Sequence, residues 1–170
     1  FARHIGFLRS VVAHDLETDA VVGTSSGALV GALWAAGIPL AEIEREFATH
    51  PPLHSMRLSR RPWRGLFDMS RALGRLREML PHTFEDLPRP LSVGVRGPGG
   101  RFLLVNRGPL PEAVAASCAI PFVFAPVVIN GVPLQDGGVV DRLGVTDWRA
   151  WRPGKHAVVN WVERTGGADV

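Results

Sequence analysis

The sequence predicts an α/β domain with a mainly parallel sheet. Short apolar runs typical of strands alternate along the chain with helical segments. Residues 23–27 also read Gly-x-Ser-x-Gly, between a short apolar run at 19–22 and a long one at 28–36. Between a strand and a helix, this pattern is a nucleophile elbow, which lifts the serine hydroxyl clear of the sheet. The 170 residues suit a single domain, and 46% hydrophobic with 21% charged residues is typical of a globular chain.

The first 50 residues predict three helices and one strand, because apolar residues recur with helical spacing around one short buried run. The segment after the elbow is apolar all round, so we expect a buried helix that Gly37 ends. The two proline residues at 51–52 stop the helix before them. The expected bounds are Ile5–Ala13, Ala20–Gly23, Ser26–Ala36 and Leu40–His50.

The middle of the chain is basic, with seven arginines between Arg57 and Arg77. We expect a loop over 55–62, followed over 63–80 by apolar residues at alternating steps of three and four. Two interpretations stay open. The segment could be a flap that touches anionic lipid surfaces, or a surface helix packed on the core. In the first interpretation the contacts come from Arg64, Arg71 and Arg75.

The second half predicts further strands around one helix. A glycine-rich turn at 97–100 joins two strand-like runs, and Asn130-Gly131 is a strong hairpin signal. Thr83 is expected to cap a short turn together with Asp86. The expected elements are strands Leu91–Val95 and Arg101–Asn106, helix Pro111–Cys118, hairpin strands Val127–Ile129 and Val132–Leu134, and a last buried strand Ala157–Trp161.

Composition narrows the function classes. Cys118 is the single cysteine, so the chain forms no internal disulfide, and no Cys/His metal cluster is visible. We therefore expect no metal and no cofactor. The net charge is only +3 and no nucleic-acid motif accompanies it, so no nucleic-acid partner is expected. The longest apolar stretch, 27–41, is short for a bilayer span. A cytoplasmic or peripheral membrane location is expected.

The motifs that carry chemistry are the elbow and an Asp-Gly-Gly turn. Ser25 needs a base, because a serine hydroxyl is a poor nucleophile near neutral pH. Asp136 follows a strand, and Gly137 and Gly138 allow a sharp turn that exposes its carboxylate. The backbone N–H of Ser26 is placed to stabilise an oxyanion. Gly23 and Gly27 leave room for the tight crossing of strand and helix.

These motifs resemble the patatin-like phospholipase family over about 140 residues from the beginning of the chain. The similar segments are 23–28 (the elbow), 136–138 (Asp-Gly-Gly), 116–121 (Ala-Ser-Cys-Ala-Ile-Pro) and 1–8, which resembles the start of the family's first helix. The resemblance implies a three-layer α/β/α fold that hydrolyses acyl esters of lipids. It also implies that Ser25 is the nucleophile and Asp136 the other half of a Ser-Asp dyad, which acts through an acyl-enzyme.

The chain departs from the family at its beginning. The family carries a glycine-rich oxyanion loop just before the first helix, and this chain starts at about the residue after it. We therefore expect a domain truncated at its N-terminus, whose second oxyanion donor lies upstream of Phe1. Two alternatives are an α/β-hydrolase with a Ser25-Asp136-His156 triad and a non-catalytic lipid-binding module. The remaining histidines lack a motif and are interpreted as surface or core residues: His4, His14, His50, His54 and His82.

Overall fold

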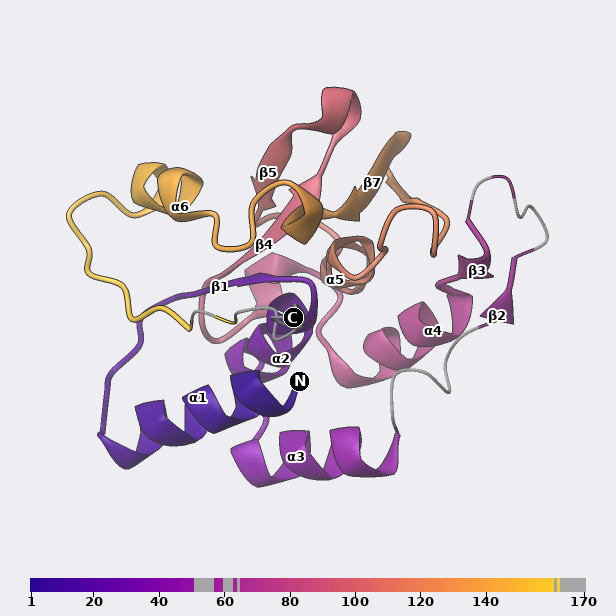
Figure 1. The fold of residues 1–170 in the computed structure, drawn as a ribbon. Helices are drawn as coiled ribbons and strands as arrows, with labels where there is room; N and C mark the ends of the chain where they lie inside the picture. The colour runs from indigo at the N-terminus through magenta and orange to yellow at the C-terminus, as the bar shows by residue number, and fades with distance from the viewer. Residues whose placement is uncertain (51–56, 60–62, 64, 161, 163–170) are drawn as a thin grey trace, which may run out of the picture.

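The computed structural model describes residues 1–170 except 51–56, 60–62, 64, 161 and 163–170. A central sheet separates α1, α2 and α3 from α6, as expected for layered α/β/α architecture (Figure 1). The helices are α1 (Ala2–Ala13), α2 (Ser26–Ala35), α3 (Leu40–Thr49), α4 (Ser70–Met79), α5 (Leu110–Ser117) and α6 (Val145–Trp151). The strands are β1 (Val21–Thr24), β2 (Arg57–Leu58), β3 (Phe67–Asp68), β4 (Leu91–Arg96), β5 (Phe102–Val105), β6 (Val127–Ile129) and β7 (Val132–Asp136). Short 3-10 helices are η3 (Phe84–Asp86), η4 (Pro98–Gly100) and η5 (Gly137–Val139).

The strand β4 organises the central sheet. β1 pairs with it in parallel, so that Thr24 lies opposite Gly94. β7 pairs with it antiparallel, so that Asp136 lies opposite Val95. β5 pairs with the same β4 residues as both of them, and it must therefore occupy the other edge of β4. β1 and β7 thus run toward each other along one edge and meet end to end at Gly94 and Val95.

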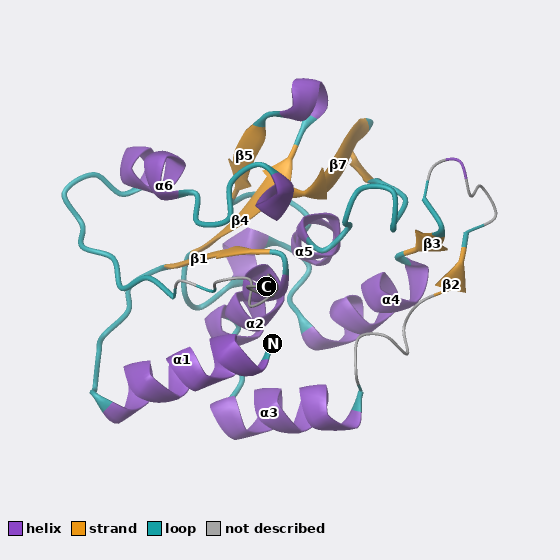
Figure 2. Ribbon diagram, in the orientation of Figure 1, coloured by secondary structure: helices purple, strands orange, loops and turns teal. Residues whose placement is uncertain are grey.

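This arrangement corrects one sequence-based expectation. The α/β class is confirmed, but in the described part of the sheet only β1 and β4 are parallel, and the remaining pairs are antiparallel. Two of these antiparallel pairs, β4 with β5 and β6 with β7, follow from the hairpin turns at 97–100 and at Asn130-Gly131, because a short turn reverses the chain direction. Figure 2 shows the resulting mixed sheet in orange between the purple helices. Both hairpins themselves were predicted from the sequence.

The core lies where α2 and α5 pack against β1 and β4. α2 buries most of its surface, as its uniformly apolar sequence predicts, and Ala28, Ala32 and Ala35 have no exposed surface. Small residues also fill α5, where Ala113, Ala115 and Ala116 are fully buried. Small side chains on both helices allow the backbones to approach the sheet closely. The residues that follow β1 and α5 are therefore held in a closely packed region.

Two further elements differ from expectation. The helical spacing over 63–80 corresponds to β3 and then α4, which begins only at Ser70. On α4, Leu76 is buried and Leu73 packs against the core, as in the core-packed interpretation of this segment.

The predicted last strand is wrong for 157–160, which form no strand and are largely exposed. An apolar run forms a strand only when a neighbour supplies hydrogen bonds, and no described strand pairs there. Trp161 lies outside the described residues.

The predicted cap of a short turn is confirmed. Thr83 and Asp86 form a capping box at the start of η3, in which each side chain bonds the other residue's backbone N–H. In the described part of the chain no helix is long and apolar enough to cross a membrane. Of the predicted loop over 55–62 only 57–59 are described, and the prediction is wrong for Arg57–Leu58, which form β2 because they pair with β3.

Candidate active site

The elbow places Ser25 in a strained conformation between β1 and α2. Its φ of 56° and ψ of −124° lie outside the regions that serine usually adopts. A Cβ on Gly23 would lie 2.4 Å from the carbonyl oxygen of Gly27, so only glycine fits where strand and helix cross. A Cβ on Gly27 would instead lie 3.3 Å from the ring of His4, so the crossing of strand and helix explains the glycine at 23 but not the one at 27. The turn projects the Ser25 side chain beyond the end of β1.

Asp136 meets Ser25 because β1 and β7 end at the same point of β4. The Ser25 hydroxyl donates a 2.7 Å hydrogen bond to Oδ2 of Asp136. The other carboxylate oxygen, Oδ1, accepts a 2.7 Å hydrogen bond from the backbone N–H of Gly138. Gly137 lies directly on β4, since a Cβ there would come within 2.8 Å of the backbone of Gly94. The Asp-Gly-Gly turn therefore holds one oxygen of the carboxylate, and Ser25 bonds the other.

Burial changes the acidity of this carboxyl group. Asp136 is 4% exposed, and removal from water raises its pKa above the ordinary value, against the opposing hydrogen bonds from Ser25 and Gly138. A carboxylate with a raised pKa is a stronger base than an exposed aspartate. Asp136 can therefore accept a proton from the hydroxyl that already points at it.

The backbone of both residues is held by three consecutive residues at the end of α5. The Ser117 hydroxyl accepts a 2.8 Å hydrogen bond from the Ser25 N–H and donates a 2.7 Å bond to the carbonyl of Gly94. The Cys118 thiol donates to the carbonyl of Ser25 at 3.3 Å. The carbonyl of Ala119 accepts a 3.0 Å hydrogen bond from the Asp136 N–H. The sequence resemblance over 116–121 included this segment but assigned no role to its residues.

The start of α2 faces the nucleophile. The first backbone N–H groups of a helix have no carbonyl partner within it, and the helix dipole makes this end positive. Ser26 is the first residue of α2, so its backbone N–H lies at this positive end of the helix, next to Ser25. Among the residues that the structure describes, no group of three or more His, Cys, Asp or Glu side chains is placed to hold a metal.

His4 is a neighbour of the elbow that the sequence did not reveal. Its Nε2 lies 3.1 Å from the Ser26 hydroxyl, and Nδ1 lies 3.0 Å from the side-chain amide of Asn160. Desolvation by burial lowers the pKa of His4. Because Asn160 donates to Nδ1, the neutral ring carries its proton on Nε2 and donates to Ser26. No motif marks this residue, so only the fold could bring it to the site.

His156, the triad candidate, does not meet the pair. It is exposed in the stretch that forms no strand, and in the described residues it bonds neither Ser25 nor Asp136. A triad would need this histidine between the hydroxyl and the acid. The direct bond between Ser25 and Asp136 instead occupies that position.

The elbow and the carboxylate beside it lie within layered α/β/α architecture. The profile of the patatin-like phospholipases matches residues 1–147. The chain is 31% identical over 144 residues to uncharacterized NTE family proteins of Mycobacterium bovis and of two Mycobacterium tuberculosis strains. The match covers 82% of this chain and 40% of each relative, so the chain spans about two fifths of their length. The chain belongs to the patatin-like phospholipase family, whose fold and lipid hydrolase kind of function were predicted from its motifs.

Proposed function

We propose that this chain is a serine hydrolase of lipid acyl esters that uses Ser25 as nucleophile and Asp136 as general base. The 2.7 Å hydrogen bond from the Ser25 hydroxyl to the buried carboxylate carries the proposal. It supplies the nucleophile and the base within direct reach of each other, which covalent catalysis requires. The membership of the family supports the lipid nature of the substrate.

The reaction then runs in two halves. Asp136 takes the proton from Ser25 as its Oγ attacks the ester carbonyl, and the oxyanion that forms is stabilised by the Ser26 N–H. When the C–O bond breaks, the protonated Asp136 gives its proton to the leaving alcohol, and an acyl-enzyme remains on Ser25. Water then attacks the acyl-enzyme while Asp136 takes its proton, and returning that proton to Ser25 releases the fatty acid.

Apolar side chains beside the dyad favour an approach from a lipid surface. The carbonyl of Ala119 bonds Asp136, and the next residues, Ile120 and Phe122, are 43% and 89% exposed. The backbone N–H of Leu66 bonds the carbonyl of Phe122, which joins β2 and β3 to this loop. We call β2, β3, the described residues between these two strands (59, 63, 65 and 66) and residues 120–125 together the arm. Exposed apolar residues continue along it: Leu58, Trp63 and Leu66.

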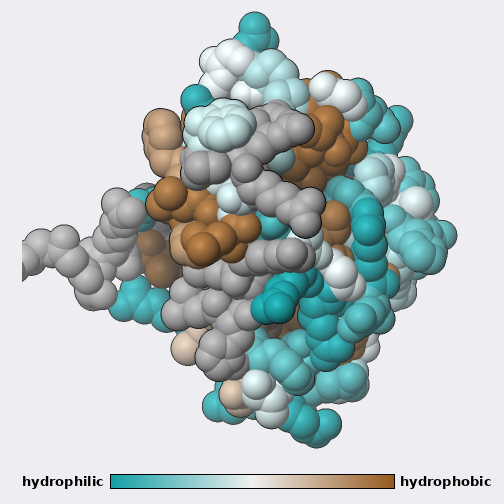
Figure 3. Space-filling view, turned by 90° about the vertical axis from the view of Figure 1, so that its right-hand side faces the viewer, coloured by the Kyte–Doolittle hydropathy of each residue, from teal (hydrophilic) through white to brown (hydrophobic). Residues whose placement is uncertain are grey.

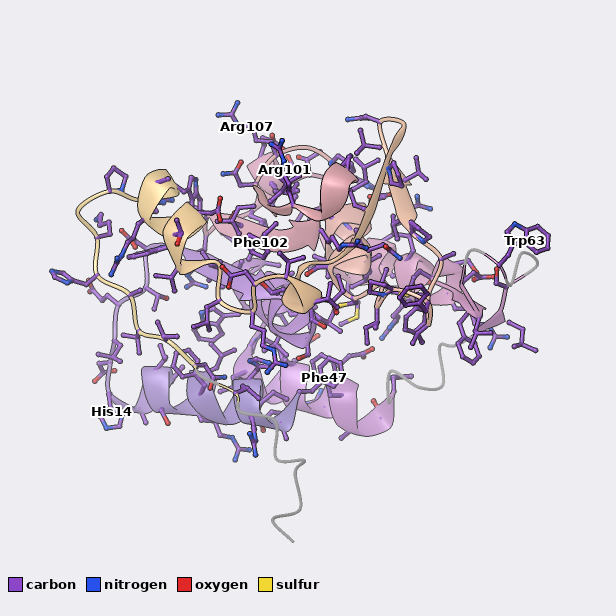
Figure 4. All side chains as sticks on the ribbon, turned by 45° about the horizontal axis from the view of Figure 1, so that its top comes forward. His14, Phe47, Trp63, Arg101, Phe102 and Arg107 are labelled. Carbon is purple, nitrogen blue, oxygen red and sulfur yellow. The ribbon has the colours of Figure 1, made fainter. Side chains whose placement is uncertain are left out.

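The arm lies at the edge of the molecule. Figure 4 shows Trp63 at its outer end, pointing away from the sheet. On the face that carries the arm, hydrophobic side chains gather at the surface (Figure 3). A patch of exposed apolar side chains next to a site for acyl esters is suited to contact acyl chains. We therefore propose that the arm contacts the lipid aggregate that supplies the substrate.

The arginines expected to contact anionic lipid differ in whether their charge is already paired with a carboxylate. Arg75 bonds Glu46 and Glu78, so its charge is already paired. Arg71 is exposed on α4 and forms no ion pair with the described residues. Arg64 lies outside the described residues. We propose Arg71 as a contact for lipid phosphate, and its contribution should weaken with added salt.

Active-site labelling tests the proposed function directly. A fluorophosphonate probe should label the parent protein, and Ser25→Ala should lose both labelling and hydrolysis of p-nitrophenyl esters while keeping its fold. Ser26→Ala should be milder, because the mechanism uses only its backbone N–H. Equal turnover by Ser25→Ala and the parent would exclude this nucleophile. A parent that binds lipid vesicles without being labelled would instead indicate a non-catalytic lipid-binding module.

A further inference from the structure

The end of α5 connects the two halves of the dyad through three consecutive residues. Ser117 bonds the Ser25 N–H, Cys118 bonds the Ser25 carbonyl, and Ala119 bonds the Asp136 N–H. Ser25 and Asp136 are 111 residues apart in the sequence. We propose that residues 117–119 form a clamp that sets the distance between nucleophile and base, and that Ser117 is its main positioning residue. This inference rests on the proposed function for its catalytic consequence.

The chemistry of Ser117 suits this task. Its side chain is fully buried, so no water can replace its hydrogen bonds. The hydroxyl donates to the Gly94 carbonyl, and its oxygen must therefore accept the hydrogen bond from Ser25. Alanine could do neither. Replacing Ser117 by alanine leaves the Ser25 N–H and the Gly94 carbonyl without this partner.

The two hydrogen bonds of the Ser117 hydroxyl lie where they can hold the backbone of Ser25 in place. Ser25 has a strained backbone, which persists only when its surroundings hold it. Ser117 holds its N–H from one side, while Cys118 and the first turn of α2 hold its carbonyl from the other. Gly94, the other partner of Ser117, also supports Gly137 and lies opposite the end of β1. One hydroxyl thus ties the elbow to the strand on which the Asp136 turn rests.

Cys118 contributes as a thiol and not as a thiolate. Burial, followed by the charge of Asp136, raises the pKa of Cys118 to about 12. It keeps its proton near neutral pH, and it can donate to the Ser25 carbonyl. Its sulfur hydrogen bond is weaker than the oxygen hydrogen bonds of Ser117. We therefore assign the larger effect to Ser117.

The test compares Ser117→Ala with Ser92→Ala. Ser92 is an equally buried serine on β4, and its hydroxyl has no hydrogen-bond partner in the described structure. We measure the rate of fluorophosphonate labelling and the kcat and KM for p-nitrophenyl butyrate, below the Tm of every variant. Ser117→Ala should label about 10²-fold more slowly, because a misplacement of about 1 Å costs this much, with KM nearly unchanged. Ser92→Ala should match the parent.

A second variant covers the possibility that Ser117→Ala does not fold. Ser117→Cys keeps the size, and its thiol is a weaker donor and acceptor, so its rate should fall between parent and Ser117→Ala. A purely structural role would lower the Tm and leave the labelling rate of the folded protein unchanged. If every folded Ser117 variant labels within twofold of the parent, the clamp has no positioning role.

Amide hydrogen exchange separates failure of the clamp from failure of the proposed function. The Ser25 N–H should be protected in the parent and in Ser92→Ala, and should exchange faster in Ser117→Ala. This readout needs no enzymatic activity, so it decides about the clamp even if the probe does not label the parent. Lack of protection at Ser25 in the parent would overturn the inference.

Discussion

The dyad and the arm lie side by side, but they are built in opposite ways. At the dyad, small polar side chains bond one another: the buried Ser117 bonds Ser25, which bonds the buried Asp136. On the arm, large apolar side chains face outward, and Phe122 is 89% exposed. Hydrogen bonds hold the dyad in a fixed geometry, whereas the apolar side chains described on the arm leave much of their surface exposed.

The two regions serve different parts of the proposed activity, the dyad the reaction itself and the arm contact with a lipid surface. Bonds at the dyad fix reacting atoms, so changes there should act on kcat with soluble and aggregated esters alike. Contacts on the arm touch none of the reacting groups, so changes there should matter only when the ester is part of a lipid surface. A change at the dyad that affected only the turnover of aggregated substrate would contradict this division of roles.

The largest effect among the further variants is expected for Asp136→Asn. Loss of a general base commonly lowers kcat by about 10²–10⁴-fold, on soluble and aggregated esters equally. The amide oxygen can still accept the hydrogen bond from Gly138, so the turn should stay intact. The control is His156→Ala, which should cost little because His156 does not contact the dyad. The reverse pattern, with His156→Ala inactive and Asp136→Asn active, would favour a triad.

The pH dependence of the parent also tests the role of Asp136 as the base. The pKa of Asp136 is raised in the folded state, because the buried carboxylate is destabilised when it is charged. The charged form therefore lowers the free energy of unfolding above that pKa, and this destabilisation disappears at lower pH, where the carboxyl group is protonated. The kcat/KM of the parent should therefore fall on the acid side at a higher pH than an ordinary aspartate would give. Asp136→Asn removes the buried charge, and it should have at least the Tm of the parent at pH 7 to 8. A lower Tm there would contradict this account of its pKa.

A smaller but still large effect is expected for Gly23→Ala. The new Cβ would lie 2.4 Å from the carbonyl oxygen of Gly27, and both backbones belong to packed elements. Overpacking of this kind costs about 1–3 kcal/mol of the free energy of unfolding, and it should displace Ser25 as well. Gly6→Ala is the matched control, because nothing lies within 4 Å of its new Cβ. Melting curves and kcat on a soluble ester check both variants, and equal stability would show that the crossing can relax.

The sequence revealed the parts of the site that carry local constraints. The elbow and the Asp-Gly-Gly turn need glycine at fixed places, since a Cβ on Gly23 or Gly137 would collide with backbone. These constraints leave a pattern in the sequence, and the fold class followed from it. Ser117 and His4 leave no such pattern, because a serine or histidine contacts the elbow only through the tertiary fold.

The predictions that failed depended on pairing between distant segments. The apolar run at 157–160 has the composition of a strand, but a strand also needs a neighbouring edge with the right register. Likewise, the spacing over 63–80 could not show that β3 pairs with β2 before α4 begins at Ser70. Hydrogen bonds between segments decide both cases, and no single segment contains that information.

The smallest effect is expected for Phe122→Asn on the arm. Phe122 has a φ of 69°, which is unusual for a bulky residue, and asparagine adopts such angles more readily. The substitution therefore removes the exposed ring without adding backbone strain. Burial of a Phe side chain in an apolar phase is worth about 1.5–3 kcal/mol, so binding to lipid vesicles should weaken by about tenfold or more. Turnover of a soluble ester should stay unchanged, while turnover of an aggregated ester should fall several-fold.

Two comparisons make this last prediction specific. Val12→Ser on α1 removes another exposed apolar side chain far from the arm in the fold, and it should change neither readout. Arg71→Gln should weaken binding to anionic vesicles at low salt and lose its effect at high salt, whereas the effect of Phe122→Asn should persist. Sedimentation with anionic and with zwitterionic vesicles separates the two contributions. If Phe122→Asn slows the soluble ester as much as the aggregated one, the arm belongs to the catalytic geometry and the division between the two regions is wrong.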